Sequence, residues 1–120
     1  MQLRLRLATD DDFRAYFGCE PPEIWTAQVA VRDEKIIGIG GVVYDIKGQA
    51  TAFLDTTERP SFVLHRAALR FLKTMRKVGE PSIRTACQEG IPRAAAWLTK
   101  LGFRKTGEII DEQEIWLWQP

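Results

Sequence analysis

Apolar and polar residues alternate along several stretches of the chain, which is the pattern of strands with one buried face. Leu3 to Leu7 alternates leucine with arginine, and residues 25–32 alternate in the same way. Short polar turns such as Asp33-Glu34-Lys35 separate further runs and favour antiparallel pairing. Besides these two, the predicted strands are 36–44, 49–55, 83–87, 103–110 and 113–118.

Three other stretches place apolar residues at helical spacing. The first follows Thr9, whose hydroxyl can cap a helix that opens with three aspartates and runs to about Gly18. The second runs from Pro60 to Val78, because proline suits a first helical turn and Gly79-Glu80-Pro81 ends it. The third runs from Pro92 to Leu101, with a glycine as its cap.

The predicted order is strand, helix, three strands, helix, strand, helix and two strands. This order predicts an α/β protein, a mixed sheet with helices on both faces. A chain of 120 residues, 45% hydrophobic and 28% charged, is the size and composition of one globular domain, spanning 1–120.

Charge and composition exclude several classes of protein. The net charge of +1 gives no general attraction to nucleic acid. The longest nearly apolar run, residues 36–44, is too short for a membrane helix, and the alternating start is unlike a signal peptide. Cys19, Cys87 and the single His65 lack the spacing of a zinc site, so we expect no metal and reduced thiols in the cytoplasm.

The segment Pro92 to Phe103, a helix ending in Gly-Phe, is similar to one in the GNAT superfamily of N-acetyltransferases. The predicted order of elements also resembles that superfamily over essentially the whole chain, and it is similar to small phage-encoded members among others. The resemblance implies the acyl-CoA N-acyltransferase fold. It also implies transfer of an acetyl group from acetyl-CoA to an amine of unknown identity.

In such enzymes acetyl-CoA lies where the fourth and fifth strands diverge. The resemblance therefore places pantetheine along Leu54 to Thr56, and pyrophosphate at the backbone N–H groups of Ser61, Phe62 and Val63. Added positive charge would come from Arg59, His65 and Arg66.

The sequence departs from the family pattern at three places. Val63 and His65 stand at the two glycine positions of the phosphate loop, so the usual phosphate cradle is not intact. Leu98 stands where the family often has a tyrosine acid. Only residues 18–23 stand in place of the family's second helix, which would leave the acceptor site open.

The general base would then be Asp55 or Glu58, acting directly or through water. The alternative is that Asp55 is a turn acid and Glu58 a solvated or helix-capping acid. The departures equally allow a noncatalytic GNAT-fold binding or assembly protein.

Other features have structural explanations beside functional ones. Arg66, Arg70, Lys73 and Lys77 form a basic stripe on the second helix, which favours a solvated face over nucleic-acid binding.

The glycines of residues 38–41 indicate a bulge or a close backbone approach rather than a dinucleotide site. Cys87 is expected to be a buried structural thiol. Trp116 and Trp118 share one strand face, either in a homodimer contact or in the core.

Overall fold

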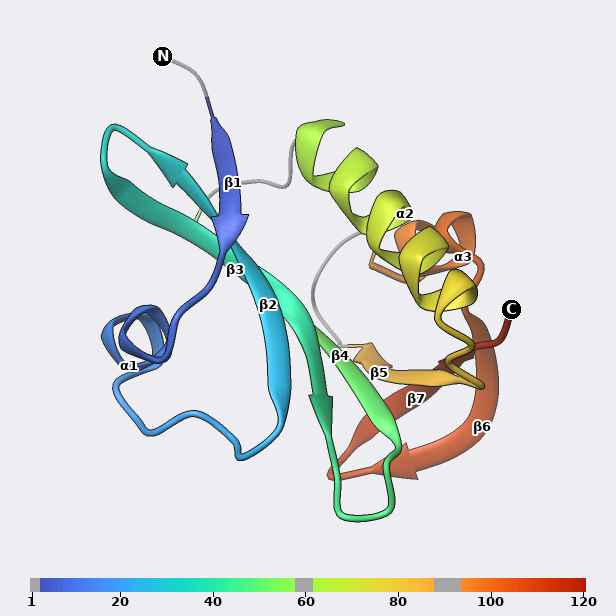
Figure 1. Ribbon diagram of the computed structural model, residues 1–120. Coiled ribbons are helices and arrows are strands. Elements are labelled where there is room, and N and C mark those ends of the chain that lie inside the picture. The colour runs from blue at the N-terminus through green and yellow to red at the C-terminus, as the bar shows by residue number, and fades with distance from the viewer. Residues whose placement is uncertain (1–2, 58–61, 88–93) are drawn as a thin grey trace.

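The computed structural model describes residues 3–57, 62–87 and 94–120, and for Phe62 and Val63 it describes the backbone alone. Ten elements follow one another in the predicted order (Figure 1). The strands are β1 (Arg4–Leu7), β2 (Trp25–Arg32), β3 (Lys35–Tyr44), β4 (Ala50–Thr56), β5 (Ile83–Cys87), β6 (Arg104–Ile110) and β7 (Gln113–Trp118). The helices are α1 (Asp10–Phe17), α2 (Phe62–Lys77) and α3 (Ala94–Leu101).

The strands form one mixed sheet in the order β1-β2-β3-β4-β5-β7-β6. Neighbouring strands pair antiparallel except β4 and β5, which run parallel and are joined through α2. Helix α1 lies on one face of the sheet, and α2 and α3 lie together on the other (Figure 1). The predicted fold class is therefore confirmed.

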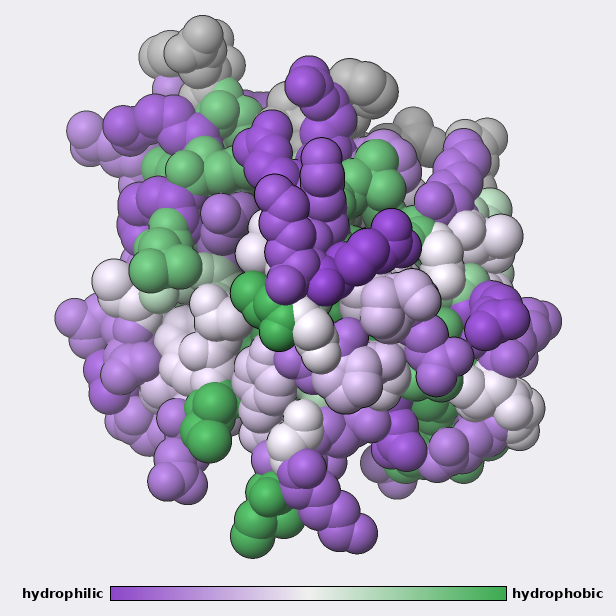
Figure 2. Space-filling model, turned by 45° about the vertical axis from the view of Figure 1, so that its right-hand side comes forward, coloured by the Kyte–Doolittle hydropathy of each residue, from purple (hydrophilic) through white to green (hydrophobic). Residues whose placement is uncertain are grey.

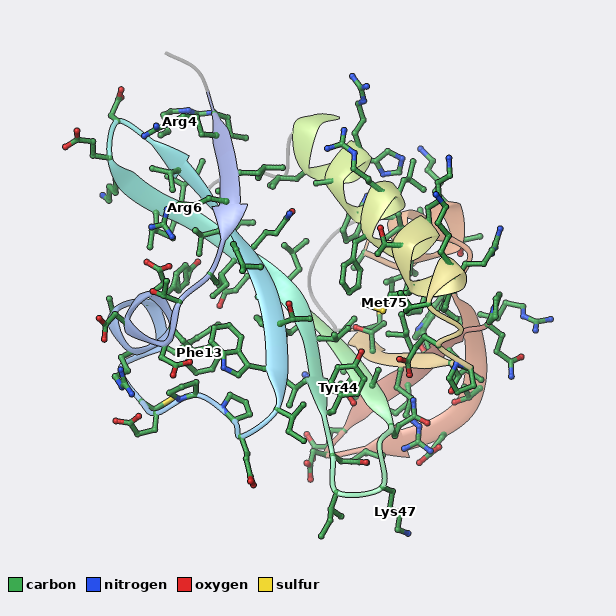
Figure 3. The ribbon with its side chains drawn as sticks, in the orientation of Figure 1. Arg4, Arg6, Phe13, Tyr44, Lys47 and Met75 are labelled. Atoms are coloured by element: carbon green, nitrogen blue, oxygen red, sulfur yellow. The ribbon has the colours of Figure 1, made fainter. Side chains whose placement is uncertain are left out.

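Each face has its own hydrophobic cluster. On the α1 face Phe13 packs against alternate residues of β2 and β3, including Val29 and Ile39 (Figure 3). On the other face Leu72 and Met75 of α2 pack with residues of β3, β4, β5, β7 and α3. Burial of these side chains drives the association of helices and sheet.

The pairing of β2 with β3 explains why residue 41 is a glycine. A Cβ on Gly41 would lie 2.1 Å from the carbonyl oxygen of Thr26, so only glycine allows the two backbones to lie this close. The predicted close approach is confirmed there. The register also shifts between Ala30 and Val31, so β3 carries a bulge beside this region.

Helix α1 starts with the predicted cap. Thr9 Oγ1 accepts from the N–H of Asp12 at 3.1 Å, and Asp12 Oδ2 accepts from the N–H of Thr9 at 2.8 Å. Arg6 of β1 also donates to Asp12, with Nη1 2.6 Å from Oδ2. These contacts tie the first strand to the first helix.

The hydrogen bond from Arg6, followed by those from Thr9, lowers the pKa of Asp12. A lowered folded-state pKa stabilises the fold above the ordinary carboxyl pKa, and this stabilisation is lost as pH falls toward the folded value. We expect Asp12→Asn to lower the unfolding free energy at pH 7 and to reduce its fall between pH 7 and pH 3, measured by urea denaturation. Asp11→Asn, at a side chain that is 95% exposed in the same turn, is the matched control. An unchanged pH dependence in Asp12→Asn would contradict this account.

None of the helices in residues 3–57, 62–87 and 94–120 is long and apolar enough to cross a membrane.

Candidate active site

The parallel strands β4 and β5 separate soon after they start. Their register pairs Ala50 with Ile83 and Thr51 with Arg84, and the pairing extends no further along β4. One side-chain contact follows, in which Thr85 Oγ1 donates to the carbonyl oxygen of Ala52 at 3.1 Å. The two strands therefore open a gap toward their C-terminal ends, as predicted.

The edge of β4 that faces this gap carries backbone groups with no strand partner among the described residues. In a strand, the N–H and C=O of one residue point to the same neighbour, and successive residues alternate between neighbours. Because the carbonyl of Ala52 faces β5, the backbone groups of Leu54 and Thr56 face the gap. An unpaired strand edge binds an extended amide-containing ligand well. Leu54 and Thr56, which bound the segment that the family resemblance assigns to pantetheine, present such an edge.

The side chain of Asp55, between Leu54 and Thr56, points to the α1 face of the sheet. Tyr16 of α1 donates from its hydroxyl to Asp55 Oδ1 over a long 3.4 Å. Burial first, and then the charge and hydrogen bond of Asp55, raise the pKa of Tyr16, so this phenol stays protonated at neutral pH. Sequence reasoning assigned Tyr16 no role, because no local pattern shows that its side chain reaches a residue 39 positions further along the chain.

Aromatic rings surround this pair on the α1 face. The ring of Phe17 lies 5.0 Å from that of Tyr16 and 6.2 Å from that of Phe53, measured between centroids. Phe17 is 36% exposed, so part of this aromatic surface faces solvent on the face of β4 that carries Asp55. A carboxylate beside exposed rings attracts an alkylammonium group.

The other tyrosine lies at the far end of the sheet. Tyr44 donates to Glu80 Oε2 at 3.3 Å and lies 3.9 Å from Met75 Sδ (Figure 3). It faces Ala50, where β4 and β5 are still paired. Tyr44 therefore has a similar carboxylate partner but lies away from the gap.

The predicted phosphate corner is described only in part. Glu58, Arg59 and Ser61 lie outside the described residues, and Phe62 and Val63 are the first residues of α2 as described.

The two basic residues that follow on α2 differ in their surroundings. His65 accepts a hydrogen bond at Nδ1 from the indole N–H of Trp97, at 2.8 Å, so this imidazole nitrogen contacts α3. Arg66 is exposed.

Two of the departures from the family pattern are visible in the fold. Leu98 is 8% exposed and belongs to the core cluster of α2, α3 and the sheet. Its position therefore supplies packing and no proton donor. Residues 18–24 contain no helix, so the chain passes from α1 to β2 without a second helix.

Cys87 is half-buried at the end of β5. Burial first, and then the charge of Glu114, raise the pKa of its thiol. A thiol with a raised pKa is a poor nucleophile at neutral pH. The structural interpretation of this cysteine is therefore favoured.

The basic stripe of α2 faces solvent. Arg66, Arg70, Lys73 and Lys77 are all exposed, and long hydrophilic side chains crowd the upper middle of the surface shown in Figure 2. This exposure is what a solvated helix face requires.

Trp116 and Trp118 do not lie on an open surface. Each is 3% exposed, and both belong to the core cluster beneath α2 and α3. Strand β7 lies between β5 and β6, so the last strand of the chain is not an edge of the sheet. The alternative of core packing is therefore confirmed, and the two rings leave almost no exposed surface for a dimer contact.

No protein-family model matches the sequence, and no curated protein is similar enough in sequence to match it. Solved structures match over nearly the whole chain. A Bacillus subtilis acetyltransferase in complex with CoA is 13% identical, with 99% of each chain covered and a TM-score of 0.68. The ribosomal-protein-S18-alanine N-acetyltransferase from Escherichia coli is 14% identical, covering 98% of this chain and 94% of its own, with a TM-score of 0.71.

An IAA acetyltransferase from Bacillus cereus ATCC 14579 is 10% identical, covering 99% of this chain and 100% of its own, with a TM-score of 0.73. These identities are low, but the coverage shows that the whole described architecture is shared, from β1 to β7. The chain has the fold of the GNAT N-acetyltransferases.

Proposed function

We propose that this protein is an acyl-CoA-dependent N-acyltransferase that transfers an acetyl group from acetyl-CoA to an amine. The observation that carries the proposal is the open edge of β4, with the Tyr16–Asp55 pair on the opposite face of the same segment. A donor site and a proton-transfer pair therefore meet within three consecutive residues.

The donor site is supported by its chemistry. The pantetheine arm carries two amides, and the outward N–H and C=O groups of Leu54 and Thr56 suit them. Pyrophosphate would lie at the N–H groups of Ser61 to Val63, with Arg59 and Arg66 adding charge. The CoA-bound structure of the Bacillus subtilis acetyltransferase, which has the same fold, supports a donor of this class.

The residues on the α1 face would carry the proton transfers. Asp55 accepts a proton from the acceptor ammonium, directly or through water, which frees the nitrogen lone pair. Glu58 is the alternative base. The nitrogen forms a bond to the thioester carbonyl carbon and releases its second proton to water, and the carbon–sulfur bond breaks. The Tyr16 hydroxyl donates its proton to the departing thiolate and recovers one from Asp55.

The acceptor is proposed to be an alkylamine. Its ammonium would approach the Asp55 carboxylate over the exposed part of Phe17, where aromatic faces and negative charge both favour a cation. The absence of a second helix in residues 18–24 leaves room for a large acceptor, such as the amino group of a peptide.

Weak donor binding is expected, because Val63 and His65 replace the glycines of the phosphate cradle. Several charge-assisted hydrogen bonds of about 1.5 to 3 kcal/mol each are then missing, which costs a hundredfold or more in affinity. The same replacement is what favours the alternative, a noncatalytic GNAT-fold binding protein.

Calorimetry with acetyl-CoA up to millimolar concentration separates the two functions. We expect saturable heat from the unmodified protein, tighter binding for Val63→Gly, and loss of binding when Arg59 and Arg66 are both replaced by Ala. Lys73→Ala, on an exposed position further along α2, is the control and should bind normally. Absence of heat at millimolar acetyl-CoA would overturn the proposal and leave the noncatalytic alternative.

A further inference from the structure

An apolar cleft lies on the α2 side of the sheet, opposite the Tyr16–Asp55 pair. It has a volume of about 370 Å³, within the range of small-molecule sites. One wall is formed by Leu64, Ala67 and Phe71 of α2, and the other by the face of β1 to β4 that is turned toward α2. The buried residues with which α2 packs onto the core cluster are Leu72 and Met75, and both lie in its C-terminal half.

Small residues keep this cleft hollow. Gly38 and Gly40 line its floor on β3 without side chains, flanked by Ala30 on β2 and Ala52 on β4. A Cβ on Gly40 would lie 2.9 Å from Leu54 Cδ1, so a side chain there would occupy part of the cleft and displace the end of Leu54. The space is therefore a property of the sequence at these positions.

The cleft leaves apolar surface in contact with water. Leu7 at its outer end is 67% exposed, and Leu54 at its inner end is 40% exposed. Its polar lining residues are Thr26, Gln28, Arg70, Thr74 and Thr85. Exposed leucines along a concave surface favour an apolar occupant, because covering them removes apolar area from water.

The cleft is continuous with the gap between β4 and β5. Ala52 and Leu54 of β4 and Thr85 of β5 line the cleft and also border that gap. From β4 the cleft crosses to Leu5 and Leu7 on β1, three strand spacings of about 4.8 Å or roughly 14 Å in all. A chain attached to a thioester in the gap can therefore lie along the cleft.

We propose that the cleft holds the acyl chain of the donor, so that the preferred donor is a medium-chain acyl-CoA, such as decanoyl-CoA. This inference rests on the proposed function and extends it. The bonds formed and broken are those of acetyl transfer, with the longer chain replacing the methyl group.

Calorimetry of the unmodified protein with CoA, acetyl-CoA, butyryl-CoA, hexanoyl-CoA and decanoyl-CoA tests this directly. Affinity should rise up to about fourfold for each added methylene, since burying one methylene is worth about 0.8 kcal/mol. Equal affinity across the series would overturn the inference while leaving the proposed function intact. Failure of every CoA compound to bind would instead overturn the proposed function and, with it, this inference.

Two variants locate the chain. Ala67→Trp fills the cleft from α2. It should abolish the higher affinity for decanoyl-CoA relative to acetyl-CoA, while acetyl-CoA still binds. Leu69→Trp adds a large ring at a position 43% exposed outside the cleft lining and should keep that higher affinity. A higher affinity for decanoyl-CoA that survives Ala67→Trp would place the chain elsewhere and contradict the inference. If Ala67→Trp does not fold, the chain-length series alone decides.

Free fatty acid is the competing source of such a chain, because Arg70 at the cleft could meet its carboxylate. Decanoate should bind far more weakly than decanoyl-CoA. Equal affinity of the two would contradict a donor site.

Discussion

Asp55→Asn is expected to lower kcat/KM for amine acetylation by about 10²- to 10⁴-fold, the usual contribution of a positioned general base. The Asp55 carboxylate lies on the face of β4 to which we assign the acceptor, and an amide cannot accept the proton of the acceptor nitrogen. Tyr16→Phe should also lower kcat, by removing the hydroxyl that contacts Asp55 Oδ1. Thiol release from acetyl-CoA with an alkylamine acceptor measures both.

Tyr44 and Glu80 provide a matched control for this prediction. They form the same kind of tyrosine–carboxylate contact at the other end of the sheet, 3.3 Å apart. Tyr44→Phe and Glu80→Gln should leave kcat/KM within a factor of a few. Equal losses in both pairs would show that the effect is structural. Full activity in Asp55→Asn and Tyr16→Phe together would remove the pair from the mechanism.

Trp118→Ala is expected to lower the unfolding free energy by about 3 to 5 kcal/mol, the cost of emptying a buried tryptophan site. The indole is 3% exposed and packs in the cluster that joins α2 and α3 to the sheet. Because this burial lies within one chain, the loss should be the same at low and high protein concentration. Urea denaturation at two concentrations measures it.

Ile109→Ala on β6 is the comparison for Trp118→Ala. Ile109 is 67% exposed on the edge strand, so its truncation should change stability by less than about 0.5 kcal/mol. A loss for Trp118→Ala that appears only at high concentration would point to an interface between chains instead.

Local sequence signals were enough to predict the elements and their order. Thr9 and Gly18 mark the ends of α1, and both act as caps in the structure. Polar turns mark the hairpins, although Asp33 and Glu34, at φ of 53° and 64°, adopt a turn that usually contains glycine. Caps and turns depend on neighbouring residues, so a sequence reveals them directly.

The open alternatives and omissions concern contacts between distant segments. The alternation of residues 113–118 shows that Trp116 and Trp118 share a face, but it does not show that β7 lies inside the sheet. Likewise, Tyr16 meets Asp55 only because α1 packs on the face of β4 that carries Asp55. The apolar cleft depends on how α2 is placed over β1 to β4, which no local pattern specifies.

A crystal structure of the protein with acetyl-CoA tests the central claim most directly. Our account predicts pantetheine density along β4 between Leu54 and Thr56, hydrogen-bonded to their outward backbone groups. The thioester should lie within reach of the Tyr16–Asp55 pair through the gap between β4 and β5. CoA bound elsewhere, with this gap empty at saturating ligand, would contradict the account.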